Sequence, residues 1–166
     1  MKTKSEIVAN WLPRYTGMKL EDFGQYIILT NFKSYVQNFA EMMNVEVQGK
    51  EAPMQSATKD NITIINFSMG SAMAATIMDL LTAIMPKAVL FLGKTGVLKS
   101  YIGLGELILP IAAIRGEGTS NDYFPPEVPA LPAFNLEKAE LKKLGLFIND
   151  KKTVIVREGQ KHLVTG

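Results

Sequence analysis

The sequence of 166 residues contains no cysteine and only one histidine, His162. The lack of cysteine excludes disulfide bonds and thiolate chemistry, and it is compatible with a reducing compartment such as the cytosol. His162 lies in a polar stretch near the end of the sequence, so we expect neither a histidine-based catalytic triad nor a histidine-rich metal site. We predict a protein that uses no metal and no other cofactor.

The sequence also lacks a hydrophobic run long enough to span a membrane. The most apolar window, Ser71 to Gly93, is interrupted by Asp79, Pro86 and Lys87, whereas a span needs about 20 apolar residues. The opening MKTKSEIVANWLPR has no apolar region typical of a signal peptide. A net charge of +2 gives no reason to expect nucleic-acid or membrane binding. We therefore expect a cytoplasmic protein with one globular domain.

Short apolar runs alternate with helical patterns, which is typical of an α/β protein. Strands are predicted at Ile62–Phe67 and Ala88–Leu92, on either side of a helix over Ala72–Ile84. This spacing is that of a βαβ unit with parallel strands. Further strands are predicted at Gln25–Thr30 and at Leu107–Ile114, the latter at an edge or with a bulge because it contains a proline.

Other patterns predict helix ends and connections. A helix over Ser5–Leu12 is expected to stop before Pro13, and Ser34 is expected to cap a second, amphipathic helix. Val45–Gln48 is a candidate short strand, followed by a polar connection over Gly49–Asn61 that ends in an Asp-Asn turn. Toward the end of the chain we expect an extended loop over Asn121–Pro132, a helix over Leu136–Leu144 and a strand over Thr153–Arg157.

A glycine-bearing turn of Gly93, Lys94, Thr95 and Gly96 directly follows a predicted strand. Glycines in such a turn let backbone N–H groups approach an anion, while Lys94 adds a positive charge and Thr95 a hydroxyl donor. The spacing is not that of a P-loop. The alternative is an ordinary strand-to-loop turn with a solvated lysine.

A second turn, with the sequence Ser-Met-Gly-Ser, begins at Ser68 and leads into the predicted helix. Its Met69 and Gly70 lie at a helix N-terminus on the same edge of the predicted sheet, where a phosphate or a ribose hydroxyl could bind. From the pattern alone, the favoured interpretation is a simple helix cap with Ser71 as the N-cap residue.

A third segment places Arg115, Glu117, Thr119 and Ser120 between glycines directly after a predicted strand. The glycines argue against a helix whose exposed surface carries these charges. Arginine is suited to a bidentate grip on phosphate or carboxylate. We therefore interpret the segment as functional rather than as a solvated loop.

Several stretches resemble a known family. They are NFSMGSAMAATIMDLL, KAVLFLGKTG and, most specifically, ELILPIAAIRGEGTSNDYFPPEVPALPAF, together with the opening EIVANWLPRYTG and YIILTNFKSYVQNFAE. These stretches resemble the short bacterial AMP nucleosidases, which belong to the purine nucleoside phosphorylase and uridine phosphorylase superfamily. The resemblance covers about Met1 to Phe134.

The resemblance implies a three-layer α/β/α fold with a central mixed, largely parallel sheet, assembled as a homo-oligomer, usually a hexamer. It implies hydrolysis of the N-glycosidic bond of AMP to adenine and ribose 5-phosphate, with AMP or phosphate as the small-molecule partner. By resemblance, Gly93, Lys94, Thr95 and Gly96 face the phosphate and ribose. Met69 and Gly70 are implied on the neighbouring turn. Arg115, Glu117, Thr119 and Ser120 are implied near the substrate or a subunit interface.

The sequence departs from the family pattern in two places. Thr95 and Val97 stand where the family loop has a cysteine and a second glycine, and a β-branched residue does not readily adopt a positive φ. Beyond Phe134 we recognise no counterpart of the family's ribose-binding Met-Glu pair or of its purine-protonating Asp, so the catalytic residues are unassigned.

We accordingly predict a nucleoside phosphorylase-like domain over residues 1–134, followed over residues 135–166 by a divergent helix-strand tail of the same domain, truncated or rearranged relative to the family. The primary hypothesis is an enzyme like AMP nucleosidase. The alternative is an inactive module that binds purine nucleotides or another subunit and lacks the general acid. A third hypothesis, an unrelated α/β domain for some other phosphorylated ligand, is disfavoured by the long specific motif.

Overall fold

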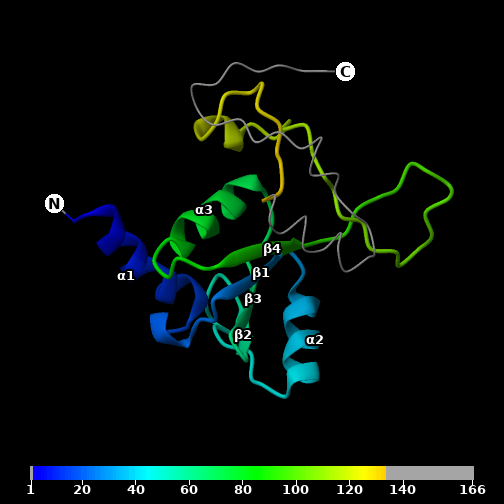
Figure 1. Cartoon of the computed structure of the whole chain (residues 1–166). Helices are drawn as coiled ribbons and strands as arrows, with labels where there is room; N and C mark the ends of the chain where they lie inside the picture. The colour runs from blue at the N-terminus through cyan, green and yellow to red at the C-terminus, as the bar shows by residue number, and fades with distance from the viewer. Residues whose placement is uncertain (1, 134–166) are drawn as a thin grey trace, which may run out of the picture. The chain divides into compact units, whose positions relative to one another are not determined.

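The computed structural model describes residues 2–133 (Figure 1). The chain divides into two compact units, the first with Met1–Leu104 and Glu117–Pro125, the second with Gly105–Gly116 and the chain from Pro126 onward. Within the described range, every α-helix and β-strand belongs to the first unit. No helix in that range is long and apolar enough to cross a lipid bilayer.

The first unit is built on a four-stranded sheet with the strand order β2-β3-β1-β4. The strands are β1 (Tyr26–Thr30), β2 (Ser56–Lys59), β3 (Ile62–Asn66) and β4 (Ala88–Leu92). β1 pairs in parallel with both β3 and β4, whereas β2 pairs antiparallel with β3. The predicted mixed, largely parallel sheet is confirmed. The two strands of the predicted βαβ unit are parallel to each other, but β1 lies between them.

Helices cover both faces of this sheet. α1 (Lys4–Thr16) and α3 (Ser71–Leu81) contribute to the hydrophobic cluster on one face, and α2 (Lys33–Met43) contributes to a second cluster on the other. Figure 1 shows α2 and α3 on opposite sides of the strands. The predicted three-layer α/β/α architecture is therefore confirmed.

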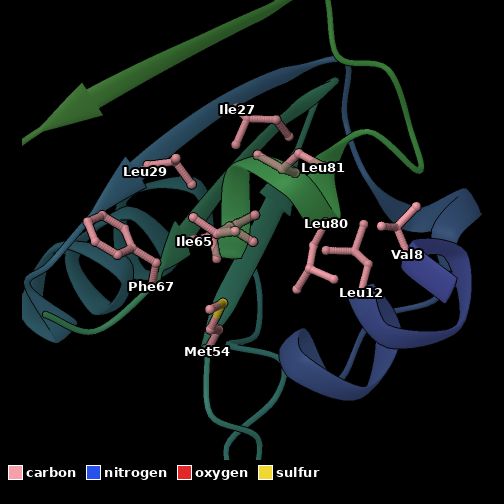
Figure 2. Close-up of a cluster of buried hydrophobic side chains, with 10 residues drawn as sticks. Val8, Leu12, Ile27, Leu29, Met54, Ile65, Phe67, Leu80 and Leu81 are labelled. Atoms are coloured by element: carbon pink, nitrogen blue, oxygen red, sulfur yellow. The ribbon is translucent and has the colours of Figure 1, made fainter. Parts of the chain in front are cut away.

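The alternation of side chains along a strand explains how one sheet serves two cores. Ile27 and Leu29 of β1 belong to the same buried cluster as Leu12 of α1 and Leu81 of α3 (Figure 2). Ile28, the residue between them, packs instead against the α2 cluster. Each fully buried side chain of this size contributes about 1.5–3 kcal/mol of hydrophobic stabilisation. The continuous apolar run of β1 is thus required by burial on both faces.

α1 does not stop before the proline, so the predicted boundary was wrong. Pro13 lies inside the helix, which continues to Thr16 and ends at Gly17 with a φ of 69°. Proline removes one backbone donor from the helix. Leu12 and Thr16, on either side of Pro13, are both fully buried, and the packing of this last turn offsets the lost hydrogen bond. The left-handed glycine, not the proline, terminates the helix.

The segment predicted as a polar connection over Gly49–Asn61 contains the strand β2. Its sequence, Ser-Ala-Thr-Lys, carries no apolar alternation that would have revealed it. β2 and β3 form a hairpin whose turn residues Asp60 and Asn61 both have positive φ, 46° and 72°. Two such residues in succession are typical of a type I′ turn, which matches the twist of a hairpin. The predicted turn is confirmed, and it joins two strands rather than a loop and a strand.

Two local predictions near α2 were wrong. Ser34 does not cap α2, because the helix already includes it and Phe32 occupies the N-cap position without a side-chain hydrogen bond. No strand forms at Val45–Gln48, where the backbone N–H of Val45 donates to Ala40 at the end of α2. Only Gln48 makes a β-bridge, to Ser56.

The strand predicted at Leu107–Ile114 is not formed either. Within the second unit, this stretch forms one isolated β-bridge, between Ala113 and Ala130. The side chains of Leu107 and Ile114 are almost fully exposed. An apolar run needs a neighbouring strand to satisfy its backbone groups, and only Ala113 has one among residues 2–133. The predicted loop over Asn121–Pro132 begins inside a short 3₁₀ helix, Thr119–Asp122. The elements predicted at 136–144 and 153–157, and His162, lie outside the described residues.

Candidate functional site

The carboxyl ends of three parallel strands meet at one edge of the sheet. Thr30 of β1 is in register with Asn66 of β3 on one side and with Leu92 of β4 on the other. The loops that follow these strands therefore begin side by side, which is the usual place of a ligand site in an open α/β sheet. The predicted turn with Lys94 follows β4 and the predicted turn with Gly70 follows β3, so the two turns begin on either side of the loop that follows β1.

Lys94, in the turn after β4, is positioned by aromatic side chains that the sequence analysis did not single out. Its Nζ lies 4.6 Å from the ring centroid of Phe32 and 5.7 Å from that of Tyr35. Both rings belong to the segment between β1 and the first turn of α2, and their centroids are 5.4 Å apart. An ammonium group over an aromatic face gains about 0.5–1 kcal/mol at an exposed site. The sequence signal that could have identified Phe32 is its position two residues after a buried strand.

The rest of this turn does not depend on left-handed glycines. Gly93 and Gly96 both lack a φ in that region. A Cβ at Gly93 would approach the Phe91 ring to 2.8 Å, whereas a Cβ at Gly96 would meet nothing within 4 Å. Val97 is also absent from the residues with positive φ, so its β-branched side chain causes no strain here. Thr95 Oγ1 donates to the Gly96 carbonyl oxygen at 3.1 Å.

The turn after β3 is held in an unusual backbone conformation. Ser68 has a φ of 72° and Gly70 a φ of 99°, and the N–H of Ser68 donates to Asn66 Oδ1 at 2.7 Å. Met69 between them is 74% exposed. A non-glycine residue such as Ser68 adopts a positive φ at a cost of about 1 kcal/mol, and such strain is concentrated at functional sites. This observation supports the turn as part of a site.

Ser71 is not the N-cap of α3, so the simple cap interpretation was wrong. Gly70 occupies the cap position and provides no side-chain hydrogen bond, and Ser71 is the first helical residue. The Ser71 hydroxyl is instead 2.7 Å from the Thr119 hydroxyl. The N–H groups of the first turn of α3 thus lack a side-chain cap, and such groups, together with the helix dipole, attract anions.

The arginine segment is divided between the two compact units. In the second unit, Arg115 Nε donates to the Val128 carbonyl oxygen at 2.6 Å. In the first unit, Glu117 Oε1 accepts from the Ser120 N–H at 3.1 Å, and Thr119 contacts Ser71 at the start of α3. The structure therefore brings Thr119 together with the turn after β3.

Two cavities adjoin the strand ends. A cavity of about 470 Å³ lies along α3 and is mostly apolar, with Asn31, Gly70 and Ser71 among its lining residues. A more polar cavity of about 360 Å³ is lined by Asn31, Lys33 and Met69, among others. Asn31 directly follows β1 and lines both cavities. A nucleotide has both an apolar base and an anionic phosphate, so neighbouring apolar and cationic cavities suit that class of ligand.

Asp79 lies on the exposed side of α3 and has two partners. Its Oδ1 accepts from Lys4 Nζ and its Oδ2 from the Tyr123 hydroxyl, each at 3.1 Å. The hydrogen bond from Lys4 is the main reason that the pKa of Asp79 is lowered; partial burial opposes this shift, and Tyr123 supports it. The Asp79 carboxylate raises the pKa of Tyr123 in turn. The network joins α1, α3 and the segment that contains Tyr123.

We expect Asp79→Asn to lower the free energy of unfolding at pH 7 by less than about 1 kcal/mol, because the Lys4–Asp79 pair is largely exposed. A lowered carboxyl pKa stabilises the fold above the unfolded-state pKa of about 4, and this contribution is lost as the pH falls through the folded-state pKa. The difference between wild type and variant should therefore shrink below about pH 4.

Urea unfolding from pH 3 to pH 7 measures this difference. Tyr123→Phe is the matched control, since it removes one hydrogen bond and keeps the salt bridge. High salt should weaken the effect of Asp79→Asn more than that of Tyr123→Phe. A difference that grows toward acid pH would contradict the assignment.

A three-layer α/β/α unit with anion-attracting turns at one sheet edge occurs in many unrelated proteins, and comparison with known proteins identifies this one as a member of the nucleoside phosphorylase class of folds. A family model described as "Phosphorylase superfamily" matches residues 25–157, which extends beyond the limit near Phe134 that the sequence analysis gave. The chain belongs to the phosphorylase superfamily. This finding confirms the family recognised from the sequence.

The most informative solved structure is an AMP nucleosidase from Bacteroides thetaiotaomicron VPI-5482. It is 57% identical, with a TM-score of 0.79, and the match covers 87% of this chain and 63% of that chain. A uridine phosphorylase from Vibrio fischeri ES114 is 26% identical, with a TM-score of 0.67, over 76% of this chain and 54% of that one.

Curated relatives give the same family. An AMP nucleosidase of Escherichia coli (strain K12) is 21% identical over 77% of this chain and 34% of its own length. A uridine phosphorylase of Treponema pallidum is 26% identical over 75% of this chain and 50% of its own length. The chain thus spans between a third and a half of the length of the curated relatives that it matches.

Proposed function

We propose that the chain provides the phosphate- and ribose-binding side of a site that hydrolyses the N-glycosidic bond of AMP. The products are adenine and ribose 5-phosphate. The observation that carries this proposal is the ammonium group of Lys94, held over Phe32 and Tyr35 beside the ends of three parallel strands. The choice of AMP is supported by the 57% identity to an AMP nucleosidase.

The groups at the strand ends suit an anionic ligand. Lys94 provides a positive charge, Thr95 a hydroxyl, and the turn at Met69 and Gly70 leads into the N-terminus of α3. Anchoring the 5′-phosphate at this edge would direct the ribose and base toward the cavities that share Asn31. Binding energy from the phosphate then orients the glycosidic bond for reaction.

The reaction replaces one bond to the anomeric carbon by another. Water adds its oxygen to C1′ of the ribose, the bond between C1′ and N9 of adenine breaks, and adenine leaves after taking up a proton. The transition state carries positive charge on the ribose, so nearby dipoles and anions lower its energy. A general acid assists the departure of adenine, and we assign no residue among 2–133 to this role.

A second candidate is a module that binds a purine nucleotide or another subunit without catalysis. It is favoured by one observation, the match to only 63% of the solved AMP nucleosidase chain.

We further propose that the protein acts in the cytoplasm and as a homo-oligomer, as expected from the family. Sedimentation of the purified chain measures the oligomeric state.

The two candidates differ in the release of adenine. We expect the purified chain, incubated with AMP, to release adenine above the uncatalysed background, as measured by chromatography. AMP that binds without adenine release would instead support the non-catalytic module. Arg115→Ala, which removes the arginine of the specific motif, is expected to weaken AMP binding in either case. Uridine with phosphate serves as the control substrate, and its faster cleavage would contradict the choice of AMP.

A further inference from the structure

Lys94 depends on side chains outside its own turn for its orientation. Its ammonium group forms no ion pair or hydrogen bond within the part of the chain that the structure describes. The turn itself gives little support, because Thr95 Oγ1 donates to the adjacent Gly96 carbonyl oxygen and a Cβ at Gly96 would meet nothing within 4 Å. An exposed lysine in such a turn samples many rotamers. The rings of Phe32 and Tyr35 are therefore the contacts that restrict its side chain.

The two rings form a platform that is attached to the central strand of the sheet. The Phe32 N–H donates to Thr30 Oγ1 at 3.1 Å, and Thr30 is a fully buried residue at the end of β1. The Tyr35 N–H donates to the Phe32 carbonyl oxygen at 3.1 Å, and Tyr35 packs against the α2 cluster. The two ring planes are tilted by 51°. The platform thus comes from β1 and α2, whereas the lysine follows the neighbouring strand β4.

A lysine held in this way is prepared to bind an anion. Its ammonium group carries three N–H donors, and an aromatic face attracts the positive charge through the quadrupole of the ring. The donors that point away from the rings remain available to a phosphate. Ordering a long side chain during binding weakens affinity, so a lysine that is already ordered binds more tightly. This gain applies only to a ligand that uses the ammonium group, and it therefore favours AMP over adenosine.

We propose that Phe32 and Tyr35 determine the selectivity of this site for a nucleoside 5′-phosphate over the corresponding nucleoside. They are positioning residues, because they act through Lys94. The inference rests on the proposed function, in which Lys94 binds the phosphate of AMP. It adds that the charge alone is not sufficient: a lysine at position 94 without the two rings selects the phosphate less well.

Phe32→Leu in the complete chain tests this proposal, with affinities for AMP and adenosine measured by isothermal titration. Leucine keeps an apolar side chain and removes the aromatic face. We expect AMP affinity to fall about three- to tenfold, the effect of ordering one long side chain during binding, and adenosine affinity to stay within about twofold. Phe32→Tyr keeps a ring and should retain the AMP affinity of the wild type. Tyr35→Leu and Tyr35→Phe should differ from each other in the same way.

A double-mutant cycle and an NMR signal separate positioning from a general structural effect. In a Lys94→Ala background, Phe32→Leu should change AMP affinity by no more than about twofold, because the rings then have no lysine to position. Ring currents should shift the ε-methylene protons of Lys94 upfield in the wild type and in Phe32→Tyr, and less in Phe32→Leu. Phe39→Leu is the matched control, since Phe39 lies one turn beyond Tyr35 on α2 and should leave AMP affinity unchanged.

Three results would overturn the proposal. The first is an equal loss of AMP and adenosine affinity in Phe32→Leu. The second is an unchanged AMP affinity in both Phe32→Leu and Tyr35→Leu while Lys94→Ala weakens it, which would leave the proposed function intact. The third is a wild type that binds AMP no better than adenosine, in which case the phosphate contact of Lys94 fails as well. AMP binding without release of adenine would contradict hydrolysis alone and would not affect this inference.

Discussion

Gly49→Ala is expected to lower the free energy of unfolding by about 3 kcal/mol. Gly49 has a φ of 66°, which costs an L-residue about 1–2 kcal/mol. A Cβ there would also overlap the carbonyl oxygen of Thr16, at the buried end of α1. Relieving such an overlap in a packed region costs typically about 1–3 kcal/mol more. The backbones of Gly49 and Gly17 are also in close contact, because a Cβ added at Gly17 would lie 2.5 Å from the Cα of Gly49.

Urea or guanidinium unfolding followed by circular dichroism measures this loss. Two other glycines separate its causes: Gly70 has a φ of 99° with nothing within 4 Å of its Cβ position, and Gly96 has neither restriction. We expect Gly70→Ala to cost about 1 kcal/mol, and Gly96→Ala to lie within about 0.5 kcal/mol of the wild type. Equal stability of all three variants would show that the α1 end does not pack against Gly49 as described.

Lys94→Ala is expected to weaken AMP binding about 10- to 100-fold. The variant removes the positive charge from the turn after β4, and a hydrogen bond to a charged group contributes about 1.5–3 kcal/mol. Lys94 is exposed and its cation–π contacts add little to stability, so the melting temperature should change by no more than a few degrees. Isothermal titration with AMP, and with adenosine as the ligand without a phosphate, measures the effect.

Two comparisons, of AMP with adenosine and of Lys94 with Lys99, test whether the charge of Lys94 contacts the phosphate. Lys99→Ala removes a second exposed lysine from the same stretch and should leave AMP affinity within about twofold of the wild type, as expected for a charge without direct contact. Adenosine affinity should be the same in Lys94→Ala and in the wild type. An equal loss for adenosine and AMP would mean that Lys94 does not contact the phosphate.

The sequence predicted the central strands well because their burial leaves a clear pattern. β1, β3 and β4 are short apolar runs bounded by polar residues, and each predicted strand lies within a residue of the observed one. β2 was missed because its four residues are stabilised by pairing with β3, not by an apolar pattern. The converse error occurred at 107–114, where an apolar pattern without a neighbouring strand did not form a ladder.

In the candidate site, too, local patterns could be recognised from the sequence, whereas contacts between distant residues could not. Lys94 and Gly70 were proposed as site residues from local features, since glycine and lysine in the turn after a buried strand are typical of an anion-binding turn, and their role stays a prediction. Phe32 and Tyr35 were not, because their role depends on a contact with Lys94 that is distant in sequence. The link between Ser71 and Thr119 could not be predicted for the same reason. Residue types indicate a site, while long-range contacts assemble it.

The position of β1 in the middle of the sheet has a consequence for folding during synthesis. β1 is the first strand made, yet its two partners, β3 and β4, come much later in the chain. Among the described strands, β2 and β3 form the only hairpin, and such a local pairing closes fastest. As the chain leaves the ribosome, β1 therefore remains without a partner strand until β3 emerges, and its other edge stays unpaired until Leu92 has emerged. Chaperones that hold short apolar segments are expected to bind the nascent chain at Tyr26–Thr30 during this interval.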